Sequence, residues 1–201
     1  MCEEMVRRGV DVGWECLSRV DTMDRLGAGE MRRAGCVRVF FGIESGNDDV
    51  LGVMNKRITV AQARRAVYAA KAAGLQVGAF FIVGYPGESD ESVLDTVRFA
   101  SGLPLDYLSF TLPYPIPGTA LYERVRGNGG VAVEDWEEPK NWSLIRHKLL
   151  YGSSFSEAKL KFAIGKAHVQ FYGRRFLGER GYGVVGMPFE LLTDVAFKLM
   201  R

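Results

Sequence analysis

Polar side chains that could bind a small ligand follow several apolar segments of the chain. Glu44 and Ser45 come directly after the apolar run 37–43, and Arg19 lies just past an earlier run. Lys56 precedes a predicted helix. In an α/β barrel, the side chains just past the carboxyl ends of the strands converge on one site. A carboxylate, a hydroxyl and cations there could bind the hydroxyl, amino and carboxylate groups of a ligand.

Each of these residues also has an ordinary structural explanation. Ser45 or Asn47 could cap a short helix that follows the second strand, and Glu44 could pair with a nearby cation. Exposed lysines are common on every protein, so Lys56 alone indicates little. Both interpretations stay open from these residues alone.

The segment 77–88, VGAFFIVGYPGE, passes from an apolar run into a turn that contains Gly84, Pro86 and Gly87. Continuous apolar runs are typical of parallel strands covered on both faces, and α/β enzymes bind ligands where such strands end. The turn is therefore a candidate wall of a ligand site. A βα loop without any ligand has the same composition, so the turn needs support from other segments.

A second candidate wall is the segment LPYPIPGT, which includes Pro115, Pro117 and Gly118 and follows the last predicted strand. Prolines fix an extended backbone, and its amide and carbonyl groups could contact the edge of a planar base.

Alternating strand and helix patterns must position these residues. Apolar runs rich in Val, Phe and Ile predict strands at 12–17, 37–43, 77–83 and 107–112. Helices are predicted between them, at 24–34, 59–73 and from about 89 to 102. Strands separated by helices indicate right-handed crossovers and a parallel sheet. Four such units make half of a barrel or an open α/β sheet.

The clearest predicted helix, 59–73, begins with Thr59 and Gln62 in the spacing of a capping box. Its small apolar residues share one face and should be buried. They are Ala63, Ala66, Val67 and Ala70.

The pattern changes after residue 126. Residues 127–155 form a predicted connecting loop in which Trp136 and Trp142 favour a small hydrophobic cluster over a substrate lid. Residues 156–201 form a helical extension, with helices near 156–177 and 188–200. His147 and His168 lie away from the strand ends, so no catalytic role is predicted for them.

Composition limits the possible functions. The chain has 201 residues, 47% of them hydrophobic, which suits a globular domain, and its net charge of +2 predicts no nucleic-acid partner. No apolar run approaches the ~20 residues that cross a bilayer, and the acidic N-terminus does not resemble a signal peptide. We therefore expect a cytoplasmic protein. Near the C-terminus, Phe189, Leu192, Val195, Ala196 and Leu199 share one stripe. This stripe could contact a partner or a membrane surface, but packing onto the barrel is the more common arrangement.

Cys2, Cys16 and Cys36 are too few and too scattered for a disulfide scaffold or a CxxC metal site. Cys16 and Cys36 occupy opposite ends of a predicted βα unit. We therefore predict that their side chains do not converge, and no metal ligand is assigned in this chain.

Taken together, five segments resemble the later part of radical SAM enzymes. They occur in the order and spacing of that family: SRVD (18–21), GCVRVFFGIESG (35–46), VLGVMNKRIT (50–59), AGLQVGAFFIVGYPGES (73–89) and PYPIPGTALYE (113–123). The likeness is to the branch that often carries an N-terminal cobalamin-binding domain. It covers residues 1–126, and FYGRRFL (171–177) resembles the helical tail of that branch. The resemblance implies an α/β fold, a partial (β/α)6 TIM-like barrel with about four parallel βα units present and a C-terminal helical extension.

The resemblance also implies that S-adenosylmethionine lies across the carboxyl ends of the strands. Glu44 and Ser45 would contact its ribose or amino group, and Lys56 its carboxylate. The other implied contacts are Ile82, Gly84 and Pro86 beside the adenine, Pro115, Pro117 and Gly118 at its edge, and Arg19 at the mouth. The family pattern GxIxGxxE is matched only in part, because Glu88 comes one residue late. We therefore attribute Glu88 to the electrostatics of a helix start. No catalytic residue is assigned.

Radical SAM enzymes hold a 4Fe-4S cluster with a CxxxCxxC motif, which this chain lacks. We therefore expect that the chain is the C-terminal portion of a longer enzyme or of a split one, and that it is inactive alone. The cluster, and cobalamin where it is used, would bind a missing N-terminal region or a partner chain. By resemblance, the intact enzyme would cleave S-adenosylmethionine to a radical and carry out methyl transfer or cyclisation on a small-molecule, lipid or porphyrin-like substrate.

Two alternatives remain open. A non-catalytic half-barrel module would expose its first strand as an edge and recruit a partner that carries the missing strands. A non-radical barrel enzyme such as an aldolase would need a lysine or paired carboxylates at the strand ends. Glu44 with Lys56 is the candidate pair for that chemistry.

Overall fold

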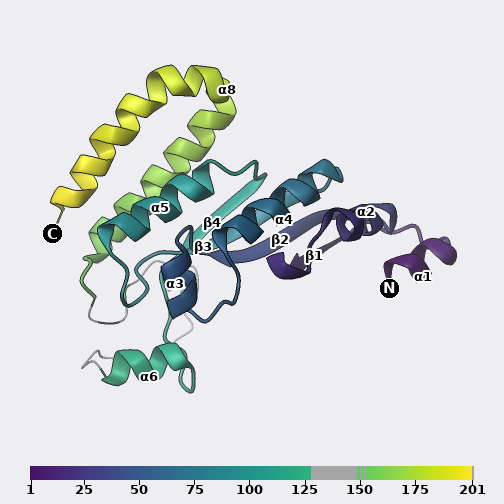
Figure 1. Ribbon diagram of the computed structural model, residues 1–201, viewed down its shortest axis with the longest axis horizontal. Coiled ribbons are helices and arrows are strands. Elements are labelled where there is room, and N and C mark those ends of the chain that lie inside the picture. The colour runs from purple at the N-terminus through teal and green to yellow at the C-terminus, as the bar shows by residue number, and fades with distance from the viewer. Residues whose placement is uncertain (128–148, 150, 152, 201) are drawn as a thin grey trace, which may run out of the picture. The chain divides into compact units, whose positions relative to one another are not determined.

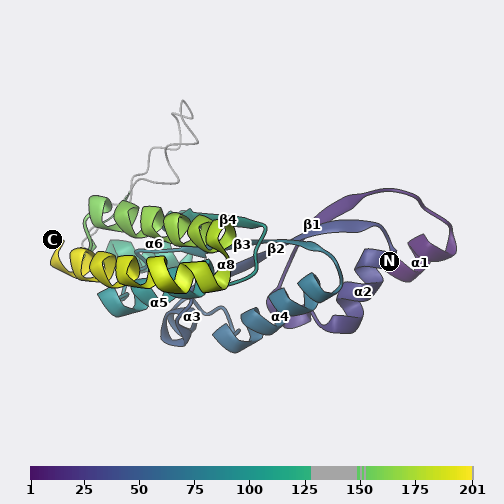
Figure 2. The ribbon, with the colours of Figure 1, turned by 90° about the horizontal axis from the view of Figure 1, so that it is seen from above.

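The computed structural model describes residues 1–127, 149, 151 and 153–200 (Figures 1 and 2). The chain forms two compact units: Met1–Phe81 with Arg98–Ser109, and Ile82–Val97 with the described part of Phe110–Arg201. The elements are, in chain order, α1 (Cys2–Arg7), β1 (Trp14–Ser18), the 3-10 helix η1 (Val20–Thr22), α2 (Arg25–Arg33), β2 (Cys36–Glu44), α3 (Asp48–Val53), α4 (Val60–Ala72), β3 (Gln76–Ile82), α5 (Asp90–Ser101), β4 (Tyr107–Thr111), α6 (Ala120–Gly127) and α8 (Glu157–Leu199).

The four strands form one sheet in the order β1-β2-β3-β4. The first three pair in parallel, with Cys16 opposite Val39 and Val39 opposite Val77. This arrangement confirms the predicted parallel α/β sheet, and each predicted strand lies within two residues of its observed bounds. In the first unit, α2 and α4 lie on one side of β1 and β2 (Figure 2).

The two faces of β2 differ in burial because successive side chains of a strand point to opposite faces. Val39, Phe41 and Ile43 are fully buried, whereas Arg38 and Phe40 on the other face are partly exposed. The predicted helix over 59–73 is confirmed as α4. The Thr59 hydroxyl accepts from the Gln62 amide at 3.1 Å, and the Gln62 side chain accepts from the Thr59 amide at 2.7 Å. The predicted apolar face of α4 is buried.

The partly exposed face of the sheet carries a polar row at the amino ends of its strands. Arg38 on β2 donates to Glu15 on β1 at 2.9 Å and to Gln76 on β3 at 2.8 Å. It also donates to the hydroxyl of Tyr107 on β4 at 2.8 Å, and its guanidinium lies 4.3 Å from the centre of that ring. One arginine therefore connects all four strands, which helps to fix their register.

The second unit contains the long helix α8, whose two arms run antiparallel and side by side (Figures 1 and 2). The arms meet at Gly178, where the backbone has φ 68° and ψ 167°. This conformation is accessible to glycine and costly for other residues, so the helix breaks there. The separate helix predicted at 188–200 is wrong in its start, because the second arm continues through Pro188.

Part of the chain had no clear sequence signal. The sequence did not predict α1 or α6, both of which are short. The predicted connecting segment 127–155 lies mostly outside the described residues, as do His147, Trp136 and Trp142. His168 is described: its ring packs against Phe110 with a centroid distance of 6.0 Å. Among the described helices, none combines the length and the apolar character needed to cross a bilayer.

Candidate functional site

The carboxyl end of β2 holds an ion pair between two of the predicted site residues. The Lys56 ammonium donates to Glu44 Oε1 at 2.9 Å, and both side chains are partly exposed. A Cβ at Gly42 would lie 2.8 Å from Glu44 Oε1, so a glycine there leaves room for the carboxylate. The sequence places these residues twelve positions apart, and the loop through α3 brings them together.

The backbone around this ion pair is unusual. Glu44 has φ 76°, and Asn55 and Arg57 on either side of Lys56 both have φ 54°. Among the described residues, these three are the non-glycine positions with left-handed backbone. Such conformations are uncommon for non-glycine residues and concentrate at functional sites, because the surrounding structure must compensate for their cost. Both chain segments that carry the ion pair are therefore held in fixed, non-standard shapes.

Ser45 and Asn47 adopt the capping arrangement that the sequence left open. Ser45 is fully buried, and its hydroxyl accepts from the Asn47 amide at 3.1 Å. The Asn47 side chain accepts from the amides of Asp49 and Val50 and so caps α3. Ser45 thus fixes the turn that follows Glu44.

Arg19 follows the end of β1 and lies on the surface. Its guanidinium makes a two-pronged contact with Asp21, with nitrogen–oxygen distances of 2.9 and 2.7 Å. This contact lowers the pKa of the Asp21 carboxyl. Because the pair is solvent-exposed, its contribution to stability is small.

In the second unit, Ile82 and Gly84 lead into a turn that is closed by Glu88. One oxygen of the Glu88 carboxyl accepts from the amides of Gly84 at 2.6 Å and Tyr85 at 2.7 Å. The Tyr151 hydroxyl donates to the Gly84 carbonyl. Gly84 itself has φ 91°, and a side chain there would collide with Leu160. Pro86 lies within this turn. Glu88, Tyr151 and Leu160 together hold the turn in place.

Glu88 corrects one sequence-based interpretation. It was attributed to the electrostatics of a helix start, but its carboxyl turns back onto the Gly84 turn and is 94% buried. Its second oxygen, Oε1, is buried and has no hydrogen-bond partner among the described residues. Burial raises the pKa of Glu88 to about 7, although the two amide donors act in the opposite direction. The spacing of Glu88 from Gly84 was a signal for this role, whereas Tyr151, 67 residues away, gave none.

We expect stability to depend on pH through Glu88. Its folded-state pKa of about 7 lies above the usual 4.5, so the folded state binds the proton more tightly. The stabilisation is complete below pH 4.5 and is lost as the pH rises through 7, and its loss should cost on the order of 3 kcal/mol. Urea unfolding followed by circular dichroism between pH 4.5 and 8 measures this change. Glu88→Gln keeps the acceptor for both amides and should remove this part of the pH dependence. An unchanged slope in that variant would contradict the assignment.

The proline-rich segment lies between β4 and α6. Pro115 is buried, whereas Pro117 and Gly118 are exposed. The carbonyl of Ile116 accepts from the Thr119 amide at 3.0 Å and from its hydroxyl at 2.7 Å, and Gly118 has φ 83°. The segment is thus an ordered turn. It belongs to the same unit as Gly84, whereas Glu44 and Lys56 belong to the other unit.

Two of the cysteines lie on neighbouring strands. Cys16 on β1 stands opposite Val39, and Cys36 on β2 stands opposite Trp14, with its thiol donating to the Arg38 carbonyl at 3.4 Å. Burial raises the pKa of Cys36 to about 11, which disfavours the thiolate that a metal requires. The part of the chain that the structure describes contains no group of three His, Cys, Asp or Glu side chains arranged to hold a metal ion.

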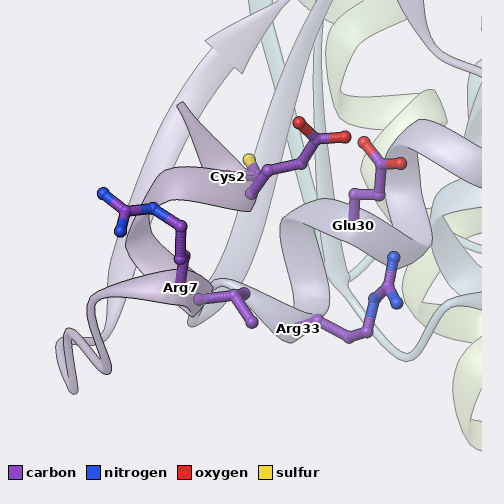
Figure 3. Close-up of a pocket in the computed structure, with 6 residues that line it drawn as sticks. Cys2, Arg7, Glu30 and Arg33 are labelled. Atoms are coloured by element: carbon purple, nitrogen blue, oxygen red, sulfur yellow. The ribbon is translucent and has the colours of Figure 1, made fainter.

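A cavity of about 340 Å³ lies at α1 and α2, where it is lined by charged side chains and Cys2 (Figure 3). Glu3 and Arg7 come from α1, and Glu30 and Arg33 come from α2. Because two acidic and two basic side chains line the cavity, its charge favours neither anionic nor cationic ligands. None of the predicted site residues lines this cavity.

Comparison with known proteins identifies the family. Residues 3–100 match the model of the radical SAM superfamily. The chain belongs to the radical SAM superfamily. This match covers β1 to β3, with the Glu44–Lys56 pair and the Gly84 turn, and confirms the family that the sequence motifs indicated.

Similar proteins include a methyltransferase and a cyclase. An uncharacterized methyltransferase of Pyrococcus horikoshii is 36% identical over 84% of this chain and 36% of its own length. The anaerobic magnesium-protoporphyrin IX monomethyl ester cyclase of Cereibacter sphaeroides is 33% identical over 62% of this chain and 21% of its own length. The chain therefore spans about a third or less of the length of these relatives.

Solved structures share the fold. The radical S-adenosylmethionine methyltransferase TsrM from Kitasatospora setae, with bound cobalamin and 4Fe-4S cluster, has a TM-score of 0.57 and 20% identity. The match covers 63% of this chain and 27% of that one. Methylornithine synthase has a TM-score of 0.54 and 13% identity, over 85% of this chain and 42% of that one. At these identities the likeness concerns the fold, and it confirms the predicted TIM-like partial barrel.

Proposed function

We propose that this chain binds S-adenosylmethionine through the Glu44–Lys56 ion pair and forms part of a radical SAM enzyme. The observation that carries the proposal is this ion pair, held by left-handed backbone at the carboxyl end of β2 in a chain of the radical SAM superfamily. The ammonium of Lys56 would bind the methionyl carboxylate, and the carboxylate of Glu44 would accept from the amino group or a ribose hydroxyl. Ser45 would support Glu44 by fixing the turn.

The other contacts of the cofactor are proposed from the family motifs. Ile82, Gly84 and Pro86 would lie beside the adenine, as the family motif implies. Pro115, Pro117 and Gly118 would close the edge of the base. Arg19 would serve as a polar contact at the mouth.

We propose that the whole enzyme carries out methyl transfer or cyclisation. S-Adenosylmethionine, cleaved by one electron from a 4Fe-4S cluster, would supply a deoxyadenosyl radical. The substrate would be a small molecule, a lipid or a porphyrin-like compound; the name of the cyclase relative supports the porphyrin-like compound, and the cobalamin bound to TsrM supports a cobalamin-dependent reaction. The described residues do not fit the cluster, because no three ligands are suitably arranged and the pKa of Cys36 is high. We therefore propose that the cluster is held outside this chain, on a longer polypeptide or on a partner.

Binding of S-adenosylmethionine tests the proposal directly. Lys56→Met should raise the dissociation constant about tenfold or more, because a charge-assisted hydrogen bond contributes about 1.5–3 kcal/mol. Equilibrium dialysis with radiolabelled S-adenosylmethionine measures this constant without the cluster.

The matched control is Lys71→Met. Lys71 pairs with Asp106 at 2.7 Å in the same unit and is as exposed as Lys56. The dissociation constant of the control should equal that of the unmodified chain. The proposal is overturned if the unmodified chain does not bind S-adenosylmethionine, or if the two variants weaken binding equally.

A further inference from the structure

The second arm of α8, residues 179–199, turns its polar side chains inward. Glu190 accepts from Arg174 and from the Tyr182 hydroxyl, both at 2.9 Å. Asp194 pairs with Lys166 on the first arm. Lys166 also donates to the Thr193 hydroxyl at 2.7 Å. These contacts use the polar groups that a surface helix normally presents to water.

The outward side of the same arm is apolar. Val184 is 76% exposed, Leu192 70% and Leu199 78%. We call this surface the apolar face of α8; it consists of Val184, Val185, Met187, Phe189, Leu191, Leu192, Val195 and Leu199. A helix with its polar side buried and a continuous apolar side exposed is the reverse of an ordinary surface helix. Large exposed apolar patches mark surfaces that contact another molecule or a membrane.

The charges around this face favour a lipid surface. Arg175 and Arg180 are exposed beside the break at Gly178, where Phe176 is 89% exposed and Leu177 is also exposed. The carboxyl groups of Glu190 and Asp194 point away from the face, so they do not oppose an anionic partner. Lys198 lies at the far end, paired with Glu91 at 3.1 Å.

The composition of the face also agrees with a lipid surface. Its residues are Val, Leu, Met and Phe, without the Trp and Tyr side chains that dominate the contact energy of protein interfaces. An apolar stripe flanked by cations, with Phe and Leu at one end, is typical of helices that lie in the plane of a membrane interface.

We propose that the apolar face of α8 lies on an anionic lipid surface. Phe176 and Leu177 enter the boundary of the acyl chains, and Arg180 contacts the headgroups. The arm lies on the bilayer without crossing it, consistent with its length and composition. This inference does not depend on the proposed binding of S-adenosylmethionine.

Vesicle flotation tests this proposal. The chain should float with phosphatidylcholine vesicles that contain phosphatidylglycerol, and the bound fraction should fall with added salt and with phosphatidylcholine alone. The double variant Leu192→Glu with Leu199→Glu should bind about tenfold less. The control is Leu26→Glu, which changes a leucine of α2 that is 79% exposed and should leave binding unchanged. Circular dichroism verifies that each variant is folded.

Two results would overturn the proposal. One is flotation of the double variant and the control to the same extent. The other is failure of the unmodified chain to float. Sedimentation velocity then tests whether a second copy of the chain covers the apolar face. In that case, the unmodified chain would form a dimer that the double variant loses, and the apolar face would be a protein interface.

Discussion

Replacing Lys166 with alanine is expected to destabilise the protein by about 4 kcal/mol, because removing one partner of a buried ion pair typically costs 3–5 kcal/mol. The Lys166 ammonium is almost fully buried between the two arms of α8. It donates to Asp194, to Thr193 and to the carbonyl of Glu190. The truncation removes all three contacts and leaves Asp194 without its lysine partner. Urea unfolding followed by circular dichroism measures the change.

Lys161→Ala provides the matched control on the same arm. Lys161 pairs with Glu157 one turn away, but both side chains are exposed. Exposed pairs of this kind contribute about 0.3–0.5 kcal/mol, so the control should change stability very little. If both variants lose the same stability, the buried ion pair does not hold the two arms together.

Gly84→Val is expected to destabilise the protein by a similar amount, also about 4 kcal/mol. A side chain at φ 91° costs roughly 1–2 kcal/mol, and more for a β-branched residue. The new Cβ would also collide with Leu160, which is fully buried, and such overpacking costs about 1–3 kcal/mol. The unfolding midpoint in urea and the hydrogen exchange of the Gly84 turn should both report the loss.

Gly87→Val separates the two causes. Gly87 has a similar φ of 97°, but no atom lies within 4 Å of the position of its Cβ. This variant should therefore show only the backbone cost, about 2 kcal/mol. A further variant that combines Gly84→Val with Leu160→Ala should relieve the collision. Equal losses for Gly84→Val and Gly87→Val would show that Leu160 does not restrict the turn.

Much of the first unit could be predicted from local patterns. The strand over 37–43 and the helix over 59–73 were found because periodicity, β-branched residues and a capping box are encoded within a few residues. The start of the second arm of α8 was missed because Pro188 normally begins or breaks a helix. The arm tolerates Pro188 in its interior, and the break occurs at Gly178.

The chemistry of the candidate site could be predicted only in part from the sequence. Glu44 and Lys56 were named as a candidate pair, but the sequence could not show whether their side chains meet, because their ion pair depends on the path of the loop through α3. Glu88 was assigned to a helix start because sequence shows position and not burial. Its raised pKa results from desolvation, which is a property of the folded interior.

The sequence by itself determined the alternation of strands and helices, the capped helix α4 and the family motifs, because these depend on neighbouring residues. Tertiary structure alone decided the contact of Tyr151 with Gly84, the arginine that connects four strands and the inward polar side of α8. Each of these joins residues far apart in the chain. Which residues meet there depends on packing and on the cost of burying polar groups, and no local sequence pattern contains that information.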